Sequence, residues 1–273
     1  MFLRRRLFAA AAAAVLISPV WAQDLVLAVN EGTTYQDLNS EPVRLRYQPL
    51  LDLLSSELKR PVKVLAVENY ASLEKGLAEE KYDMAFIHPA HIGLQAVKSG
   101  NYQGLCTAKG FTDYRARVLV PKDSPLKSMQ DLQGKKLGVP SMESITTVMF
   151  VANLRQMNFS QPEKMLTATR YQDAVPFMIE KGFVDAGVTG SGAVEKEWKS
   201  KGGRVLGETS AVPVKQFLIS KKIGEAERDK VRALMTGLAN NEAGKAALAR
   251  IGMTGFVQWD AGVMKQASTQ LGI

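Results

Sequence analysis

Apolar residues recur along this chain in two patterns, short continuous runs and longer stretches with helical spacing. The short runs are bounded by polar or turn residues, which is typical of strands buried in a sheet. In the longer stretches apolar positions repeat every three or four residues, which predicts amphipathic helices. Strands are expected at residues 24–29, 62–67, 83–87, 103–108, 115–120, 136–139, 165–168, 184–188, 204–206 and 214–219. Helices are expected at residues 43–59, 71–80, 172–181, 192–201, 224–238 and 242–251, with others opening at 88–91 and at Ser144.

The order of these elements predicts an α/β fold with two lobes. Alternating strands and helices favour parallel pairing with helices on both faces of a sheet. The strands at 115–120 and 214–219 follow polar breaks, and we expect the chain to cross between the lobes there. This division gives lobe 1 residues 23–114 plus 215–273, and lobe 2 residues 115–214. The segment after residue 251 has a mixed pattern and receives no element.

The first 22 residues have the pattern of a secretory signal peptide. Arginines at positions 4–6 precede an alanine-rich apolar run at 7–17, and small residues end at Ala22. That run is too short to span a bilayer comfortably, so cleavage after Ala22 is expected rather than anchoring. The sequence therefore predicts export by general secretion.

Charge and cysteine content exclude several classes of function. The net charge of +8 is spread along the chain rather than gathered in a stripe, so nucleic acid is not an expected partner. The single cysteine, Cys106, has no partner for an internal disulfide and is expected to be buried. The chain lacks the Gly-x-Ser-x-Gly, Gly-x-x-x-x-Gly-Lys-Ser/Thr and His-Glu-x-x-His motifs, so we expect neither an enzyme nor a cofactor.

The stretch DLQGKKLGVPSMESITTVMF, residues 131–150, is the best candidate for an anion site. It predicts a strand, a loop and a helix whose start is rich in hydroxyls, with Ser141, Ser144, Thr146 and Thr147 close together. The first turn of a helix has unpaired N–H groups and a partial positive charge, and both favour an anion. The alternative is ordinary N-capping, for which Ser144 alone would suffice.

Other candidate residues lie in loops that follow predicted strands. Ligands of open α/β sheets bind at the carboxyl ends of the strands, where such loops converge. Tyrosines can pack on a ligand and donate a hydrogen bond, and Arg170 offers a bidentate guanidinium. His88 and His91 could face an oxyanion or bind a metal, but two imidazoles alone make a weak metal site, so no metal is expected.

Several segments together resemble a known family. They are DLQGKKLGVPSMESITT and the stretches at residues 47–64, 69–92 and 170–188, in that order. In order and spacing they are similar to the periplasmic substrate-binding proteins of phosphate, phosphite and phosphonate ABC transporters. The resemblance implies a type II periplasmic binding fold, in which each lobe is a mixed sheet flanked by helices and two crossing strands join the lobes. It implies that the lobes close over a small oxyanion and that the closed form meets an inner-membrane ABC permease, with the binding protein a monomer.

The resemblance and the loop positions together give the expected ligand-binding residues: Thr34, Tyr35, Tyr70, His88, His91, Tyr114, Ser141, Ser144, Thr146, Thr147, Arg170, Tyr171, Gln172 and Thr189. The family commonly has a histidine where this chain has Gln172, and often a glycine after the hydroxyl cluster that is absent here. The anion could therefore differ from a phosphonate. Two alternative functions remain open, a periplasmic sensing module for a membrane kinase and a metal-binding protein that uses His88 and His91.

Overall fold

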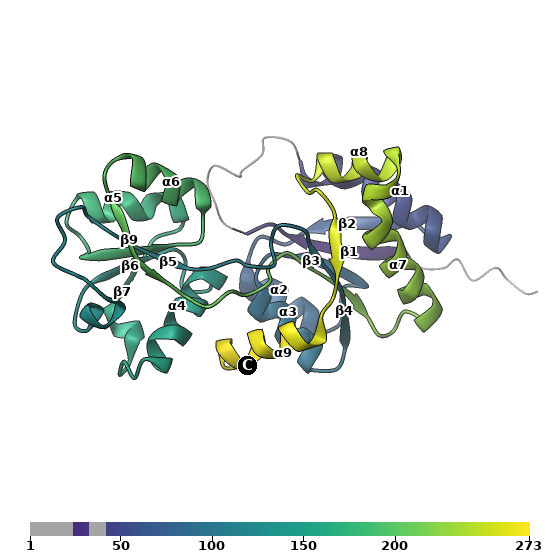
Figure 1. Cartoon of the computed structure of the whole chain (residues 1–273). Coiled ribbons are helices and arrows are strands. Elements are labelled where there is room, and N and C mark those ends of the chain that lie inside the picture. Colours follow the sequence, from purple (N-terminus) through teal and green to yellow (C-terminus); the bar gives the residue numbers. More distant parts are fainter. Residues whose placement is uncertain (1–23, 33–41) are drawn as a thin grey trace, which may run out of the picture.

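The structure, a computed structural model, describes residues 24–32 and 42–273. Figure 1 shows two lobes side by side, each built around its own sheet. The first lobe surrounds a six-stranded sheet in the order β11-β4-β10-β3-β1-β2, and the second surrounds a five-stranded sheet in the order β7-β6-β8-β5-β9. The predicted two-lobed α/β fold is confirmed.

The first sheet is mixed. Its strands are β1 (Leu25–Asn30), β2 (Val62–Ala66), β3 (Met84–Ile87), β4 (Tyr102–Ala108), β10 (Gln216–Ser220) and β11 (Phe256–Gln258). Strand β1 pairs in parallel with β2 and β3, whereas β10 runs antiparallel to β3 and β4. Its helices are α1 (Val43–Leu58), α2 (Tyr70–Ala78), α3 (Ala90–Lys98), α7 (Glu225–Gly237) and α8 (Glu242–Arg250).

The second sheet repeats this plan on a smaller scale. Its strands are β5 (Arg117–Val120), β6 (Leu137–Val139), β7 (Leu166–Ala168), β8 (Ala186–Thr189) and β9 (Arg204–Glu208). Strand β6 pairs in parallel with β7 and β8, and β5 runs antiparallel to β8 and β9. The helices of this lobe are α4 (Ile145–Gln156), α5 (Val175–Glu180) and α6 (Gly192–Ser200).

The chain crosses between the lobes in two segments that lie beside each other. These are residues 109–116, between β4 and β5, and residues 209–215, between β9 and β10. An antiparallel bridge joins Tyr114 to Val212, whose N–H donates to the Tyr114 carbonyl at 2.9 Å. The crossings therefore come just before β5 and β10, which are themselves full members of their sheets.

Sequence patterns located most elements to within a few residues but gave none after residue 251, where the structure has β11 and α9 (Ala261–Leu271). Helix α9 starts at the N-cap Asp260, whose carboxylate accepts from the Val263 N–H, and ends at Gly272 with φ of 74°. Its buried residues Met264, Ala267 and Leu271 share one apolar core with residues of α3, α4 and the second crossing. The helix thus packs against both lobes, below their junction in Figure 1.

The core of the first lobe is organised around aromatic rings. Phe86 lies between Tyr47, Phe217 and Phe256, with ring centroids 5.5–6.4 Å from its own. Cys106 is fully buried beside them, as expected, and burial raises the pKa of its thiol.

Replacing Phe217 with alanine tests this core. Phe217 is 0% exposed, so Phe217→Ala should lower the free energy of unfolding by about 3–5 kcal/mol, because it leaves a cavity between sheet and helices. Phe177→Ala is the matched control: that ring is 53% exposed, and we expect a change within about 0.5 kcal/mol. Urea unfolding followed by circular dichroism measures both, and equal losses would contradict the assignment of the core.

Candidate functional site

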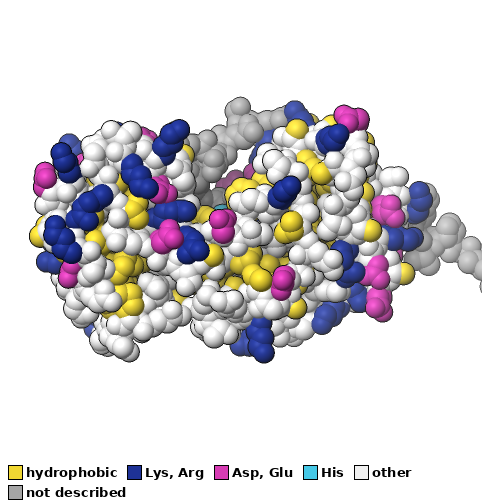
Figure 2. Space-filling model, in the orientation of Figure 1, with side chains coloured by type: hydrophobic (Ala, Val, Ile, Leu, Met, Phe, Trp, Pro, Cys, Tyr) yellow, Lys and Arg dark blue, Asp and Glu magenta, His cyan; other side chains and the backbone are white. Residues whose placement is uncertain are grey.

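A cavity of about 310 Å³ lies between the two lobes. Both lobes and both crossing segments contribute to it. Figure 2 shows the hollow between the lobes, with a histidine and charged side chains of both signs at its edge. The lining residues are Glu31, Gly32, His88, Gly110, Phe111, Asp113, Tyr114, Arg117, Gln172, Gly190, Ser191, Gly192 and Lys215.

The wall from the first lobe is formed where β1 and β3 end. The two strands pair in parallel with Asn30 opposite Ile87, so the residues that follow them, Glu31 and His88, come out side by side. The His88 N–H donates to the Asn30 carbonyl at 2.8 Å. Gly32 has φ of 93°, and a Cβ on it would lie 2.9 Å from Cδ2 of His88. A glycine is needed here because the imidazole lies against the backbone.

The Glu31 carboxylate is held by two residues of α1. Arg46 donates from Nη1 to Oε1 at 2.8 Å and from Nη2 to Oε2, so the pair is bidentate. Tyr47 donates to the same Oε1 at 3.1 Å. Burial, reinforced by the Glu31 charge, holds the pKa of Tyr47 well above its usual value. Glu31 therefore presents a fixed carboxylate at the cavity, partly neutralised by Arg46.

His88 is neutral at neutral pH. Its ring meets that of Tyr114 edge-on, with centroids 5.3 Å apart and planes at 88°. Burial lowers its pKa to about 3, with smaller contributions from Lys215 and from His91. Burial alone lowers the pKa of His91 to about 4. Among the described residues, Nδ1 of each ring is buried without a hydrogen-bond partner.

The wall from the second lobe is a connected set of hydrogen bonds around Gln172. The Tyr114 hydroxyl lies 2.6 Å from Oγ1 of Thr146 and accepts from Nε2 of Gln172 at 3.4 Å. On its other side Oε1 of Gln172 accepts from Oγ1 of Thr189 at 3.2 Å and from the Gly190 N–H at 2.5 Å. Burial raises the pKa of Tyr114, so its hydroxyl stays protonated. A neutral amide thus fixes the tyrosine and the loop after β8.

The hydroxyl cluster at the start of α4 is already paired within the protein. Ser144 is the N-cap of α4, and its Oγ accepts from the Thr147 N–H at 3.3 Å. Oγ1 of Thr147 donates to the Pro140 carbonyl at 3.2 Å, and Thr146 bonds to Tyr114. All three side chains are buried and none lines the cavity. Ser144 therefore acts as an ordinary N-cap, and Thr146 supports the cavity wall through its hydrogen bond to Tyr114.

Charged groups face the cavity from the crossing segments and the second lobe. Lys215, with φ of 55°, places its ammonium 5.0 Å from the centre of the Phe111 ring. Arg117 pairs with Glu195 at 3.0 Å and with Glu208 at 3.7 Å. Helix α6 begins at the cavity: its N-cap Ser191 and first residue Gly192 are both lining residues. The Val194 N–H is capped by Ser191 Oγ at 3.4 Å, and the N–H groups of Gly192 and Ala193 together with the Lys215 ammonium make this side favourable for an anion.

The structure brings three of the residues expected from the sequence to the cavity: His88, Tyr114 and Gln172. Those that do not line it are Tyr70, His91, Ser141, Ser144, Thr146, Thr147, Arg170, Tyr171 and Thr189. Tyr70 is buried in the first lobe and contributes to the raised pKa of Tyr114. Exposed Arg170 stacks on Tyr171, with Cζ 5.1 Å from the ring centre. Thr34 and Tyr35 lie outside the described residues.

The lining residues missed by sequence reasoning carry most of the charge: Glu31, Asp113, Arg117 and Lys215. Glu31 could have been found, because it directly follows the first strand at its carboxyl end. Lys215 and Asp113 belong to the crossing segments, and the strand-end rule does not cover such segments.

Two further observations concern metals and membranes. Within residues 24–32 and 42–273 no three histidine, cysteine, aspartate or glutamate side chains gather as metal ligands would. In the same residues no helix has the length and apolar character needed to cross a bilayer.

The two buried histidines predict acid sensitivity. A pKa below the unfolded value of about 6.5 means that the unfolded chain binds the proton first as the pH falls. Stability should therefore fall below pH 6.5, by at most about 1.4 kcal/mol per pH unit for each histidine, until the folded values near 3 and 4 are reached. Urea unfolding between pH 7 and pH 5 should show a shallower loss in His88→Gln/His91→Gln, which has no histidine left. An identical pH slope in the two proteins would contradict neutral burial.

Comparisons with known proteins identify the family. Residues 34–262 match the family described as "ABC transporter, phosphonate, periplasmic substrate-binding protein". The phosphonates-binding periplasmic protein of Escherichia coli (strain K12) is 23% identical over 257 residues, which cover 88% of this chain and 75% of that protein.

Two solved structures share the fold. XAC2383 from Xanthomonas citri, bound to ATP, is 16% identical, with a TM-score of 0.74 over 92% of this chain and 98% of its own. PhnD1 from Prochlorococcus marinus, in complex with methylphosphonate, is 16% identical, with a TM-score of 0.67 over 91% of this chain and 98% of its own. The chain belongs to the periplasmic substrate-binding proteins of phosphonate ABC transporters.

Proposed function

We propose that this protein captures a small phosphonate-like oxyanion in the cavity between its lobes and delivers it to an inner-membrane ABC permease. The observation that carries the proposal is the cavity itself, which is enclosed by both lobes and both crossings and lined by polar groups. Its volume of about 310 Å³ is at the lower end of the range for ligand sites, which favours a small molecule. The relatives that bind methylphosphonate and ATP, both phosphorus oxyanions, support this class of ligand.

The anionic group is best placed between the start of α6 and Lys215. The N-cap Ser191 takes only the Val194 N–H, at 3.4 Å, so the N–H groups of Gly192 and Ala193 have no acceptor within the helix, and their dipoles favour negative charge. Lys215 faces the same cavity, and the Tyr114 hydroxyl can donate to an oxygen that reaches it. This placement uses α6 rather than α4, whose hydroxyls are occupied by Pro140, Thr147 and Tyr114.

The cavity also holds two carboxylates, and although Arg46 partly neutralises Glu31, a purely anionic ligand offers neither carboxylate a positive charge. Glu31 and Asp113 line it together with Arg117 and Lys215, and His88 is neutral. A zwitterion, with a cationic substituent beside the carboxylates and its oxyanion beside Lys215, satisfies both signs. We therefore infer that an aminoalkylphosphonate is a better ligand than an alkylphosphonate of the same length.

Closure of the lobes makes the ligand contacts simultaneous. Residues from both sides reach one cavity only when the lobes are together, so a ligand that binds both walls shifts the population toward the closed state. The two crossings at 109–116 and 209–215 are the hinge. The membership of β4, β5, β9 and β10 in the two sheets supports lobe boundaries at 114/115 and 214/215, although α9 packs on both lobes.

Cellular context completes the proposal. The family is periplasmic, and the first 22 residues, which lie outside the described part of the chain, serve as a cleaved signal peptide. The protein works as a monomer and has no catalytic role. The family assignment favours transport over sensing for a kinase and over metal binding by His88 and His91.

A thermal-shift screen tests the function. Protein unfolded and refolded to remove carried-over ligand is mixed with phosphate, phosphite, methylphosphonate, 2-aminoethylphosphonate, ethanesulfonate and acetate. A ligand at about 1,000 times its Kd stabilises the folded state by about 4 kcal/mol and raises Tm by several degrees. We expect the largest shift with 2-aminoethylphosphonate. If none of the six compounds moves Tm, the transport proposal fails, and a shift with ethanesulfonate alone would reassign the ligand.

Two cation variants test where the anion binds. Lys215→Met should weaken binding of the best ligand by about 10- to 150-fold, the effect of losing a charge-assisted hydrogen bond of about 1.5–3 kcal/mol. Arg170→Ala removes an exposed cation that stacks on Tyr171 outside the cavity, and we expect a change of less than about threefold. Isothermal titration calorimetry measures both. A larger loss of affinity in Arg170→Ala than in Lys215→Met would instead place the anion at the loop before Gln172.

A further inference from the structure

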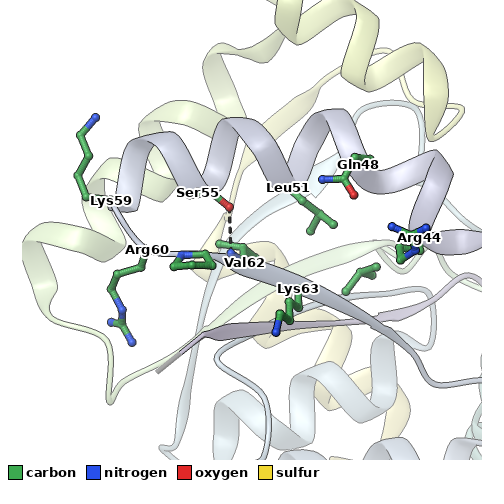
Figure 3. A pocket seen from close by; sticks show the side chains of 10 residues that line it. Arg44, Gln48, Leu51, Ser55, Lys59, Arg60, Val62 and Lys63 are labelled. Atoms are coloured by element: carbon green, nitrogen blue, oxygen red, sulfur yellow. Dashed lines mark hydrogen bonds between the residues drawn. The ribbon is translucent and has the colours of Figure 1, made fainter. Parts of the chain in front are cut away.

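A second and larger hollow, of about 690 Å³, lies on the first lobe and shares no residue with the interlobe cavity. It is a groove between α1 and β2. Figure 3 shows α1 along one side, with Gln48, Leu51 and Ser55 on its face toward the strand, and β2 along the other, with Val62 and Lys63. The Val62 N–H donates to Oγ of Ser55 at 2.9 Å and closes the groove near one end.

Strand β2 is an edge of its sheet, and part of its backbone is open toward the groove. Among the described residues β2 pairs with β1 alone. The Pro61 carbonyl accepts from the Leu25 N–H, and the Val67 N–H donates to the Val29 carbonyl. The backbone N–H and C=O groups of odd-numbered residues in this strand therefore point toward β1. Even-numbered residues therefore point their N–H and C=O groups outward, as the bond from Val62 to Ser55 confirms. Val64 and Ala66 keep outward groups that a further strand could use.

The groove combines an apolar floor with a basic rim. Leu51 and Val62 are buried in the floor, and Val64 is partly buried beside them. Four cationic residues line it: Arg44, Lys59, Arg60 and Lys63. None of the ten described lining residues is acidic, although Lys63 pairs with Asp24 just outside. An anionic occupant is therefore favoured, and a cationic one is repelled.

We propose that this groove binds an extended acidic peptide segment of a partner protein, which adds to β2 as a further strand of the first sheet. A groove between an edge strand and an overlying helix is suited to strand addition, because main-chain bonds give affinity and alternate side chains give specificity. Peptide side chains that point into the groove meet Leu51 and Val64, and acidic peptide side chains meet the cationic rim.

The open backbone groups decide between a peptide and other anions. A fatty acid would use the rim and the floor, and a free phosphate the rim alone, but both would leave the N–H and C=O groups of Val64 and Ala66 unbonded. An extended acidic peptide uses the basic rim, the apolar floor and the open backbone groups of β2. The proposal does not depend on the ligand of the interlobe cavity, so either can fail without the other.

Fluorescence anisotropy with a labelled peptide of alternating glutamate and valine tests the proposal on the full mature chain. We expect saturable binding that weakens as salt rises, and no binding of the matched peptide with lysine in place of glutamate. Val64→Pro removes one outward N–H without breaking a bond to β1, and proline is tolerated at such edge positions. This variant should abolish binding of the acidic peptide and keep the thermal shift given by the cavity ligand.

Charge variants keep the test valid if Val64→Pro is poorly folded. Arg44→Glu/Lys59→Glu should reduce affinity for the acidic peptide at least about tenfold. The matched control is Lys230→Glu/Lys265→Glu, two exposed lysines on α7 and α9, for which affinity should stay within about twofold. Equal loss in the two double variants, or equal binding of the lysine peptide, would overturn the proposal. So would dodecanoate binding in place of the peptide, or self-association in sedimentation that Val64→Pro abolishes.

Discussion

The side chain of Tyr114 holds together everything that forms the interlobe cavity. Its backbone is paired to Val212, so it sits where the two crossings meet. Its hydroxyl reaches Thr146 at the start of α4 and is approached by Gln172, both in the second lobe. Its ring lies edge-on to His88 in the first lobe. Hinge, second lobe and first lobe therefore meet at one buried phenol.

The same contact explains why a hydroxyl-rich helix start is an ambiguous signal. Sequence alone cannot tell whether Ser144, Thr146 and Thr147 face a ligand or one another, because both arrangements use the same residue types. In the structure the Thr146 hydroxyl is hydrogen-bonded to Tyr114, 32 positions away, and the Thr147 hydroxyl donates to the Pro140 carbonyl in the loop before α4. Only the tertiary contact separates the two cases. At α6 the start of the helix does line the cavity, although the sequence there, Ser191-Gly192, is less conspicuous.

Local rules therefore predicted the fold well and the site less completely. Buried runs gave the strands, Pro89 and Ser144 marked the starts of α3 and α4, and the order of elements gave two lobes. The end of the chain was missed because α9 gains its stability from packing against both lobes, which periodicity does not report. His88 was found because it follows a strand, and Tyr114 and Gln172 were found through the resemblance to the family. Lys215 and Asp113 were not, because a crossing segment has no periodic pattern that would show which way its side chains point.

The charge of the whole chain is a poor guide to its cavity. The sequence carries a net charge of +8, which alone would mildly favour an anionic ligand. In the cavity Glu31 and Asp113 oppose Arg117 and Lys215, and Arg117 is already paired with two glutamates. The basic surplus lies elsewhere, and part of it gathers at the groove beside β2. Selection of a ligand between the lobes must therefore depend on where single charges and N–H groups are placed, because the site has little net charge with which to attract an anion indiscriminately.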